Sequence, residues 1–171
     1  NCVAHNGQYG LNAYQAGNQL TGLLVEGNEF TGNNTDDWEA KVDGCGCTGA
    51  MKFWSVDGAD IRGNWIHRNH GPGIWADTNN NDFLIEDNLI EANDAQAIFY
   101  EISYNATIRN NVLRRNTWRE GRDFADQDDW FPVGTVYLSE AGGEPRVQAR
   151  TSVLEVTGNV FDNNWGGVVG W

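Results

Sequence analysis

Asp77 and Glu101 are the two acidic residues whose spacing predicts catalysis. The segments that end on them, GIWAD and AIFYE, are alike and place them 24 residues apart at equivalent positions. On neighbouring strands, about 4.8 Å apart, their carboxyl groups should lie roughly 5 to 6 Å from each other. Two carboxyl groups this close titrate as a pair with one pKa raised. Retaining glycosidases hold their acid and nucleophile ~5 to 5.5 Å apart. The spacing therefore predicts a glycoside hydrolase with Glu101 as general acid and Asp77 as nucleophile or stabiliser of the sugar cation.

Other interpretations of this pair stay open. In a polysaccharide lyase, Ca²⁺ bound by Asp77 and Glu101 would neutralise a uronate, and Lys52 would remove the proton α to it. Arg119 and Arg122 are further basic residues that an inserted loop could bring to the same surface. Alternatively, the two carboxylates are Ca²⁺ ligands alone, or ordinary surface acids of an acidic protein. Ca²⁺ is the one cofactor that the sequence suggests.

Aromatic residues accompany the acidic pair. Alternation along a strand that turns Ile74 and Ile98 inward turns Trp75 and Phe99 outward. Exposed rings suit the apolar faces of sugars, so this column predicts a polysaccharide-binding groove. The predicted sugar-binding residues are Trp54, Trp75, Phe99, Tyr137 and Trp171. The alternative is that Trp38, Trp118 and Trp130, from inserted loops, fold over the column and bury it.

These residues belong to an internal repeat. Asn88 and Asn93 return as Asn111 and Asn116 after 23 residues. The other pairs with the same internal spacing are Asn1/Asn6, Asn28/Asn33, Asn64/Asn69 and Asn159/Asn164. Apolar residues recur at three fixed places in each repeat, as Ile85, Ile90 and Ile98 illustrate. Three short strands per repeat with inward side chains predict an all-β, triangular parallel β-helix of about five to six coils, forming one domain over residues 1–171.

The paired asparagines are predicted to be scaffold. A turn between strands needs a residue that tolerates a left-handed backbone, and Asn is suited to it. Stacked asparagine amides can also donate and accept hydrogen bonds from coil to coil. Asn79 and Asn80 are expected in an exposed turn, where substitution should matter less.

The pattern V/I-x-G/D/N-N-x-ϕ-x-x-N, repeated six times, resembles the right-handed parallel β-helix proteins of the pectin-lyase-like superfamily. The resemblance covers essentially the whole chain and implies a right-handed coil. The superfamily includes polysaccharide lyases, glycoside hydrolases, epimerases, adhesins and phage tailspikes, so fold alone implies no single activity. The segments KFW, GPGIWADTNN and EISYNA are similar to secreted bacterial β-helix proteins. The alternative to an enzyme is therefore a non-catalytic glycan-binding or structural module.

The composition limits the classes of partner that the protein is expected to bind. The net charge of -13 and the pI near 4.4 argue against nucleic acid or an anionic membrane as a partner. The sequence contains no run of 18 apolar residues, so it predicts no membrane-spanning helix. A polysaccharide partner and an extracellular or cell-surface location are expected, while the oligomeric state stays open. Because both ends lie within the repeat, the chain is expected to be part of a longer solenoid.

Three insertions interrupt the repeat, at 34–48, 117–133 and 139–152. All flank the strand column formed by 49–54, 73–77, 97–101, 134–138 and 167–171, so they should wall a groove over it. The three cysteines are Cys2, Cys45 and Cys47. We expect one disulfide, from Cys2 to Cys45 or Cys47.

The other two faces are predicted to have a structural role only. Glu26, Arg62, Glu86 and Arg109 share one outward column, and Glu91, Arg114 and Asp162 share another. Alternating charges on neighbouring strands indicate cross-strand pairs. His67 begins the second column and is expected at the surface.

Overall fold

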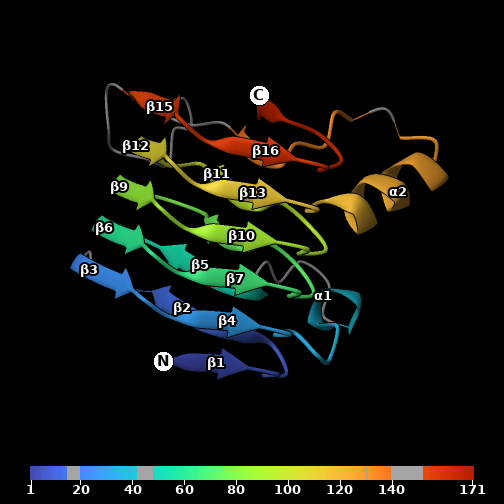
Figure 1. The fold of residues 1–171 in the computed structure, drawn as a ribbon, viewed down its shortest axis with the longest axis horizontal. Helices are drawn as coiled ribbons and strands as arrows, with labels where there is room; N and C mark the ends of the chain where they lie inside the picture. The colour runs from blue at the N-terminus through green and yellow to red at the C-terminus, as the bar shows by residue number, and fades with distance from the viewer. Residues whose placement is uncertain (15–19, 42–47, 130, 140–151) are drawn as a thin grey trace.

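The computed structural model describes residues 1–14, 20–41, 48–129, 131–139 and 152–171. Short strands coil into a solenoid with three parallel sheets, and the coils stack from the N-terminal end to the C-terminal end (Figure 1). Sheet A contains β1 (Cys2–Ala4), β4 (Glu29–Thr31), β7 (Trp65–His67), β10 (Leu89–Glu91), β13 (Val112–Arg114) and β16 (Val160–Asp162). Sheet B contains β2 (Tyr9–Tyr14), β5 (Gly49–Trp54), β8 (Ile74–Ala76), β11 (Ile98–Glu101), β14 (Val136–Ser139) and β17 (Val168–Gly170). Sheet C contains β3 (Leu20–Glu26), β6 (Val56–Arg62), β9 (Asn81–Glu86), β12 (Tyr104–Arg109) and β15 (Leu154–Thr157).

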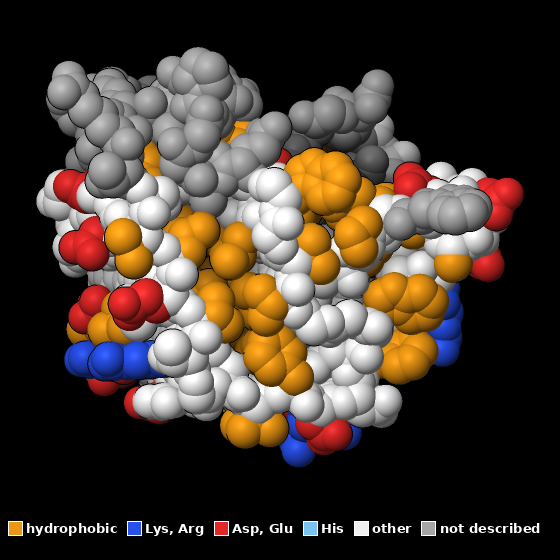
Figure 2. Space-filling model, turned by 90° about the horizontal axis from the view of Figure 1, so that it is seen from above, with side chains coloured by type: hydrophobic (Ala, Val, Ile, Leu, Met, Phe, Trp, Pro, Cys, Tyr) orange, Lys and Arg blue, Asp and Glu red, His pale blue; other side chains and the backbone are white. Residues whose placement is uncertain are grey.

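The core fills the inside of the coils. Ile85, Ile90 and Ile98 lie on three different sheets and are each fully buried. Equivalent residues pair across coils, as Ile61 with Ile85 and Ile85 with Ile108. Seen from above, hydrophobic side chains gather along the middle of the uppermost end, with charged side chains at its sides (Figure 2). The predicted three-sided β-helix is confirmed.

Two asparagine ladders run along the corners of sheet A. Asn64 Nδ2 donates to Asn88 Oδ1 at 2.9 Å, and Asn88 Nδ2 donates to Asn111 Oδ1 at 3.0 Å. The second ladder repeats this contact between Asn69 and Asn93, also at 2.9 Å. Each buried amide thus bridges neighbouring coils, as the repeat predicts.

The backbone role expected for these asparagines is wrong. The residue with positive φ is the one before the ladder asparagine, such as Asp87 at 55° or Gly63 at 61°. The ladder asparagine itself is not left-handed, because it must follow the turn with its side chain directed into the coil, where the amide reaches the next coil. The turn residue is therefore free to be Gly, Asp, Arg or Ala.

The third corner corrects the expectation for Asn80. This residue is fully buried rather than exposed, and its Nδ2 donates to Ser103 Oγ at 3.1 Å and to Phe53 O at 3.2 Å. Its Oδ1 accepts from the Val56 amide at 3.1 Å. Asn80 thus takes part in a short ladder at the third corner, in which Ser103 stands where the next asparagine would be.

The insertions carry two helices, α1 (Trp38–Lys41) and α2 (Trp118–Asp126), beside the solenoid (Figure 1). No helical periodicity in the sequence predicted α2. Most of the insertion at 139–152 lies outside the described residues, as do Cys45 and Cys47. Cys2 is a free, exposed thiol, so the disulfide expected for it is wrong. Its side chain is on the outer side of sheet A beside Glu29, the residue with which it pairs.

Sheets A and C form a charged wall. Arg62 pairs with Glu26 at 2.9 Å and Arg109 with Glu86 at 2.7 Å, as predicted. The Arg114–Glu91 pair, at 2.7 Å, is confirmed on sheet A. Burial raises the pKa of Glu91, but hydrogen bonds from Arg114 and Trp65 outweigh it, and the net pKa is lowered.

His67 differs from the expectation of a surface residue. It points outward but is buried, with 4% of its surface exposed. The Trp65 ring stacks on it at 3.9 Å between centroids, and Glu29 Oε1 lies 3.0 Å from its Nε2. The large neighbouring indole covers a position that alternation alone places at the surface.

Candidate functional site

The predicted aromatic column exists on the outer face of sheet B. Trp75 stacks on Phe99 with centroids 5.2 Å apart and planes 16° apart, and Phe99 stacks on Tyr137 at 5.0 Å and 13°. Phe131 meets Tyr137 edge to face at 5.5 Å. Because the rings stack along the solenoid axis, their faces contact one another and their edges point to solvent. The column offers a sugar ring edges rather than flat platforms.

Lys52 closes the lower end of this stack. Its Nζ lies 3.2 Å from the centre of the Trp75 ring and 2.7 Å from Asp77 Oδ2, and 2% of the residue is exposed. The contact with Asp77 is a close ion pair without hydrogen-bond geometry, so the ammonium has no oriented acceptor among the described residues. Lys52 is thus a buried cation in contact with an aromatic ring, not an exposed base.

The structure brings Asp77 and Glu101 together. Ala76 pairs with Tyr100, so the residues that follow them lie side by side on neighbouring coils. Glu101 Oε2 accepts a hydrogen bond from Trp75 Nε1 at 3.0 Å. Both carboxylates have partners within the column: Lys52 for Asp77 and Trp75 for Glu101. Their catalytic role stays a prediction.

The remaining predicted binding residues lie at the two ends of the column. Trp54, 41% exposed, contacts Tyr14 at 5.1 Å between centroids. Trp171 is 70% exposed and contacts Phe131 at 5.3 Å. Trp118 does not cover the column, because its Nε1 donates to Asn163 O at 2.7 Å on the side of sheet A. Trp130 lies outside the described residues.

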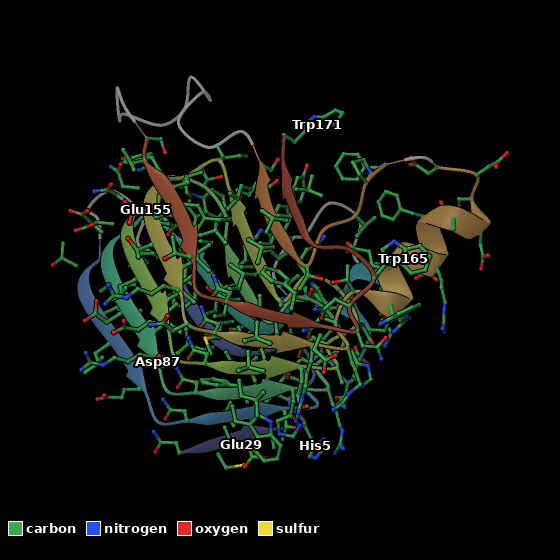
Figure 3. The ribbon with its side chains drawn as sticks, turned by 45° about the horizontal axis from the view of Figure 1, so that its top comes forward. His5, Glu29, Asp87, Glu155, Trp165 and Trp171 are labelled. Carbon is green, nitrogen blue, oxygen red and sulfur yellow. The ribbon has the colours of Figure 1, made fainter. Side chains whose placement is uncertain are left out.

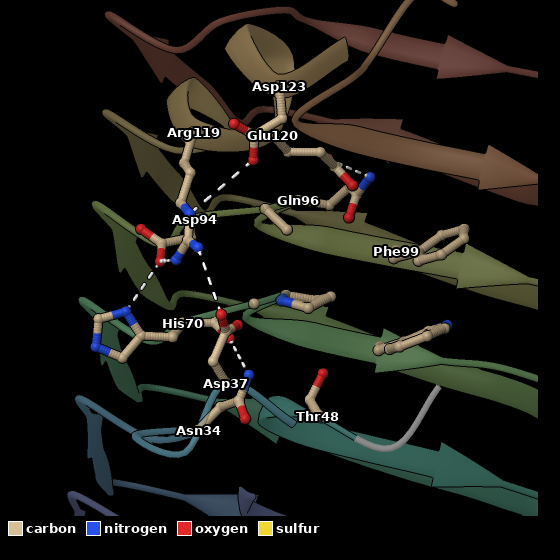
Figure 4. A pocket seen from close by; sticks show the side chains of 14 residues that line it. Asn34, Asp37, Thr48, His70, Asp94, Gln96, Phe99, Arg119, Glu120 and Asp123 are labelled. Atoms are coloured by element: carbon tan, nitrogen blue, oxygen red, sulfur yellow. Dashed lines mark hydrogen bonds and ion pairs between the residues drawn. The ribbon is translucent and has the colours of Figure 1, made fainter. Parts of the chain in front are cut away.

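A cleft of about 310 Å³ opens beside the column, where the turns after sheet A lead into sheet B (Figure 4). The Trp75 and Phe99 rings form part of its lining. Residues before α1 and residues of α2 form its walls. Its polar lining includes Asn34, Asp37, Thr48, His70, Asp94, Gln96, Arg119, Glu120 and Asp123.

Arg119 is the centre of the cleft's charged network. Its guanidinium lies 3.0 Å from Asp94, 3.8 Å from Asp37 and 4.0 Å from Asp123. His70 Nδ1 lies 2.9 Å from the same oxygen of Asp94 that Arg119 contacts. Hydrogen bonding to Asp94 raises the pKa of Arg119. Asp94 is therefore held between two cationic partners whenever His70 is protonated.

Glu120 is the one carboxyl group of the cleft whose pKa is strongly raised, to about 7. Burial is the largest cause, the hydrogen bond from Gln96 opposes it, and the negative charge of Asp123 adds to it. Gln96 Nε2 donates to Glu120 Oε2 at 2.7 Å. Such a group is half protonated near neutral pH, as a general acid requires.

Close packing holds α2 against the last coil. A Cβ at Gly121 would overlap the indole of Trp165, so only glycine lets the helix lie this close. Trp165 is beside α2 in Figure 3, and Trp118 meets it edge to face at 5.5 Å. The sequence located this insertion but not its helix, and so missed Glu120 and Asp123. It also missed Asp94 and Gln96, which lie in the turn after β10. The acidic residues three apart, Glu120 and Asp123, were the available signal.

The described ranges contain neither a metal-binding cluster nor a helix that could cross a membrane. No group of three or more His, Cys, Asp or Glu side chains there is arranged to bind a metal. The helices within the same ranges are too short or too polar to cross a membrane.

Three all-parallel sheets in a single winding define a three-sided right-handed parallel β-helix protein. The family described as "right handed beta helix region" matches residues 1–137, and the chain belongs to this family. Comparison with curated proteins found no match, and comparison with solved structures found none.

Proposed function

We propose that this protein binds a polysaccharide outside the cell or at its surface and cleaves it beside the face of sheet B. The observation that carries the proposal is the cleft: it joins the aromatic column to a wall of carboxyl, amide and guanidinium groups. Concave sites that combine apolar lining with a few convergent polar groups are typical of ligand binding. A carboxyl group with raised pKa in such a site favours chemistry over binding alone.

The cleft supports a glycan better than an apolar ligand. Amide and carboxylate side chains such as Asn34, Gln96 and Asp94 match the hydroxyl groups of a sugar. The exposed edges of Trp75 and Phe99 supply apolar contact at one side. A longer chain would continue from the cleft over sheet B, toward Trp54 or Trp171.

The test uses α2, which forms one wall of the cleft. Gly121→Ala would push α2 away from Trp165, whereas Gly167→Ala adds a methyl group where no atom lies within 4 Å. Binding to a panel of soluble polysaccharides is measured by calorimetry, and products are measured as reducing ends and unsaturated sugars. We expect at least tenfold weaker binding for Gly121→Ala and unchanged binding for Gly167→Ala. Equal binding by both variants would show that the cleft is not the site.

A non-catalytic glycan-binding module is the second candidate. It is favoured by the partners of the acidic pair, because Asp77 is tied to Lys52 and Glu101 to Trp75. A polysaccharide that binds the wild-type protein without any product would support this alternative and reject cleavage.

A further inference from the structure

We propose that Glu120 is the proton donor of the cleft, that Asp123 is its base, and that the substrate is a neutral glycan. This rests on the proposed function and assigns catalysis to α2 rather than to the acidic pair of sheet B. Both residues line the same cleft, and they lie three apart on one helix. That spacing puts their Cβ atoms ~5 to 6 Å apart on one face of α2.

The surroundings of Glu120 suit a donor. The side chain is mostly buried, and the hydrogen bond from Gln96 uses one carboxyl oxygen. The described residues supply no further hydrogen bond to this carboxyl group, so its own proton has no protein acceptor there. A ligand oxygen in the cleft is the acceptor that this arrangement lacks. The raised pKa agrees with a carboxyl group that keeps its proton near neutral pH.

Asp123 is the carboxylate of the cleft that is most open to water and lies farthest from Arg119. Its side chain is 60% exposed, and its cationic neighbour, Arg119, is at the outer limit of an ion pair, 4.0 Å away. Asp94, by contrast, contacts both His70 and Arg119 at 3.0 Å or less. Because two donors already occupy this carboxylate, Asp94 positions Arg119 rather than activating water.

The reaction is hydrolysis and needs only water as co-reactant. Glu120 gives its proton to the glycosidic oxygen as the bond from that oxygen to the anomeric carbon breaks. Water adds to the anomeric carbon, and its proton passes to Asp123. Transfer of a proton from Asp123 to Glu120 through solvent restores the starting state, and the products are two shorter sugars.

The charge of the cleft decides the class of glycan. The groups that face Glu120 come from every surrounding element: Asp94 and Gln96 after β10, His70 after β7, Asp37 before α1, and Arg119 and Asp123 on α2. Three ionised carboxylates outnumber the guanidinium of Arg119, even with His70 protonated. A uronate would meet a net negative charge here, so a neutral sugar is the better fit.

The experiment measures cleavage of xylan, galactan, β-glucan and polygalacturonate by the wild-type protein, Glu120→Gln, Asp123→Asn and Glu101→Gln. Glu86→Gln, on the far wall, is the matched control. We expect one of the neutral polymers to be cleaved and polygalacturonate to be left intact. Glu120→Gln should lose at least ~10²-fold in kcat while its affinity changes less than threefold.

The pH profile of the wild-type protein gives a second readout that needs no variant, and Gln96→Leu extends it. In the wild-type protein, kcat/KM should fall as pH rises through about 7, because Glu120 then loses its proton. Gln96→Leu should move this fall to higher pH, because the hydrogen bond from Gln96 lowers the pKa of Glu120.

The outcomes separate the two proposals. No binding and no product from any polymer overturns both. Binding without product rejects the catalytic role of Glu120 and leaves the binding module. Cleavage that Glu120→Gln retains, or that Glu101→Gln alone abolishes, overturns this inference and leaves the proposed function intact, as does a wild-type profile that stays flat to pH 9.

Discussion

The corners of sheet A and the cleft beside sheet B are built on opposite principles. Along sheet A, each coil repeats the last, and one amide per corner makes the same contacts on successive coils. Beside sheet B, inserted segments bring together groups that occur once, such as Glu120 and Arg119. The contrast teaches that repetition stabilises the solenoid, whereas departures from repetition create the chemistry.

The two regions also handle buried polar groups differently. The ladder asparagines are fully satisfied by neutral hydrogen bonds. Sheet B instead buries an ammonium, that of Lys52, against a carboxylate and an indole. The cleft partly buries the carboxyl group of Glu120, and burial raises its pKa to about 7. The stability that the neutral ladder provides should not depend on pH, whereas that of the cleft should.

The largest effect should come from interrupting a ladder. Asn88→Ala removes hydrogen bonds to Ile61 O, to Asn111 and from Asn64. Each buried group left unpaired costs ~1 to 3 kcal/mol, so we expect a loss of about 4 kcal/mol in the free energy of unfolding. Chemical denaturation checks this, with the exposed Asn12→Ala as control. Equal stabilities would show that the ladder is not a source of stability.

The buried ion pair of sheet B gives the next effect. Asp77→Asn leaves the Lys52 ammonium without its anion, which should destabilise the protein by about 3 kcal/mol. The double variant Lys52→Met/Asp77→Asn removes both charges and should recover most of that loss. Unfolding free energies of the single and double variants form a double-mutant cycle. If the double variant is less stable than Asp77→Asn, the charges of Lys52 and Asp77 do not compensate each other.

The cleft should make stability depend on pH. The pKa of Glu120 is raised from 4.5 to about 7, so the folded protein holds a proton that the unfolded chain releases. The stabilisation is fully present below pH 4.5 and is lost as pH rises through 7, by up to about 3 kcal/mol. Glu120→Gln should remove this dependence. Amide exchange of α2 across this range measures it, and an equal slope in both proteins would assign it to other groups.

The sequence was sufficient for the scaffold because the scaffold is periodic. The spacing of Asn88 and Asn111 determined the coil, and alternation placed Ile98 inward and Phe99 outward. Alternation did not reveal that the rings stack on one another, because that depends on rotamers across three coils. Nor did it reveal the burial of Lys52, which follows from the size of the Trp75 ring beside it.

The residues that line the cleft could not be predicted from the sequence, for a different reason. His70 and Asp94 follow β7 and β10 one 24-residue coil apart, but the residues of α2 occupy no position of the repeat. Position in the repeat predicted where the insertion at 117–133 would lie. The close contact that fixes α2, Gly121 against Trp165, joins residues far apart in the chain. Only the folded arrangement shows that Glu120 is buried there.

The smallest effect on stability should come from the exposed ion pairs of sheet C. Arg109→Ala on sheet C removes an ion pair with Glu86 at 2.7 Å, but the arginine side chain is 47% exposed. Water screens such a pair, so the change in unfolding free energy should stay below about 1 kcal/mol. Denaturation in low and high salt should show the remaining difference shrinking as salt rises. A loss as large as that of Asn88→Ala would mean that outward charges, and not the inward amides, hold the coils together.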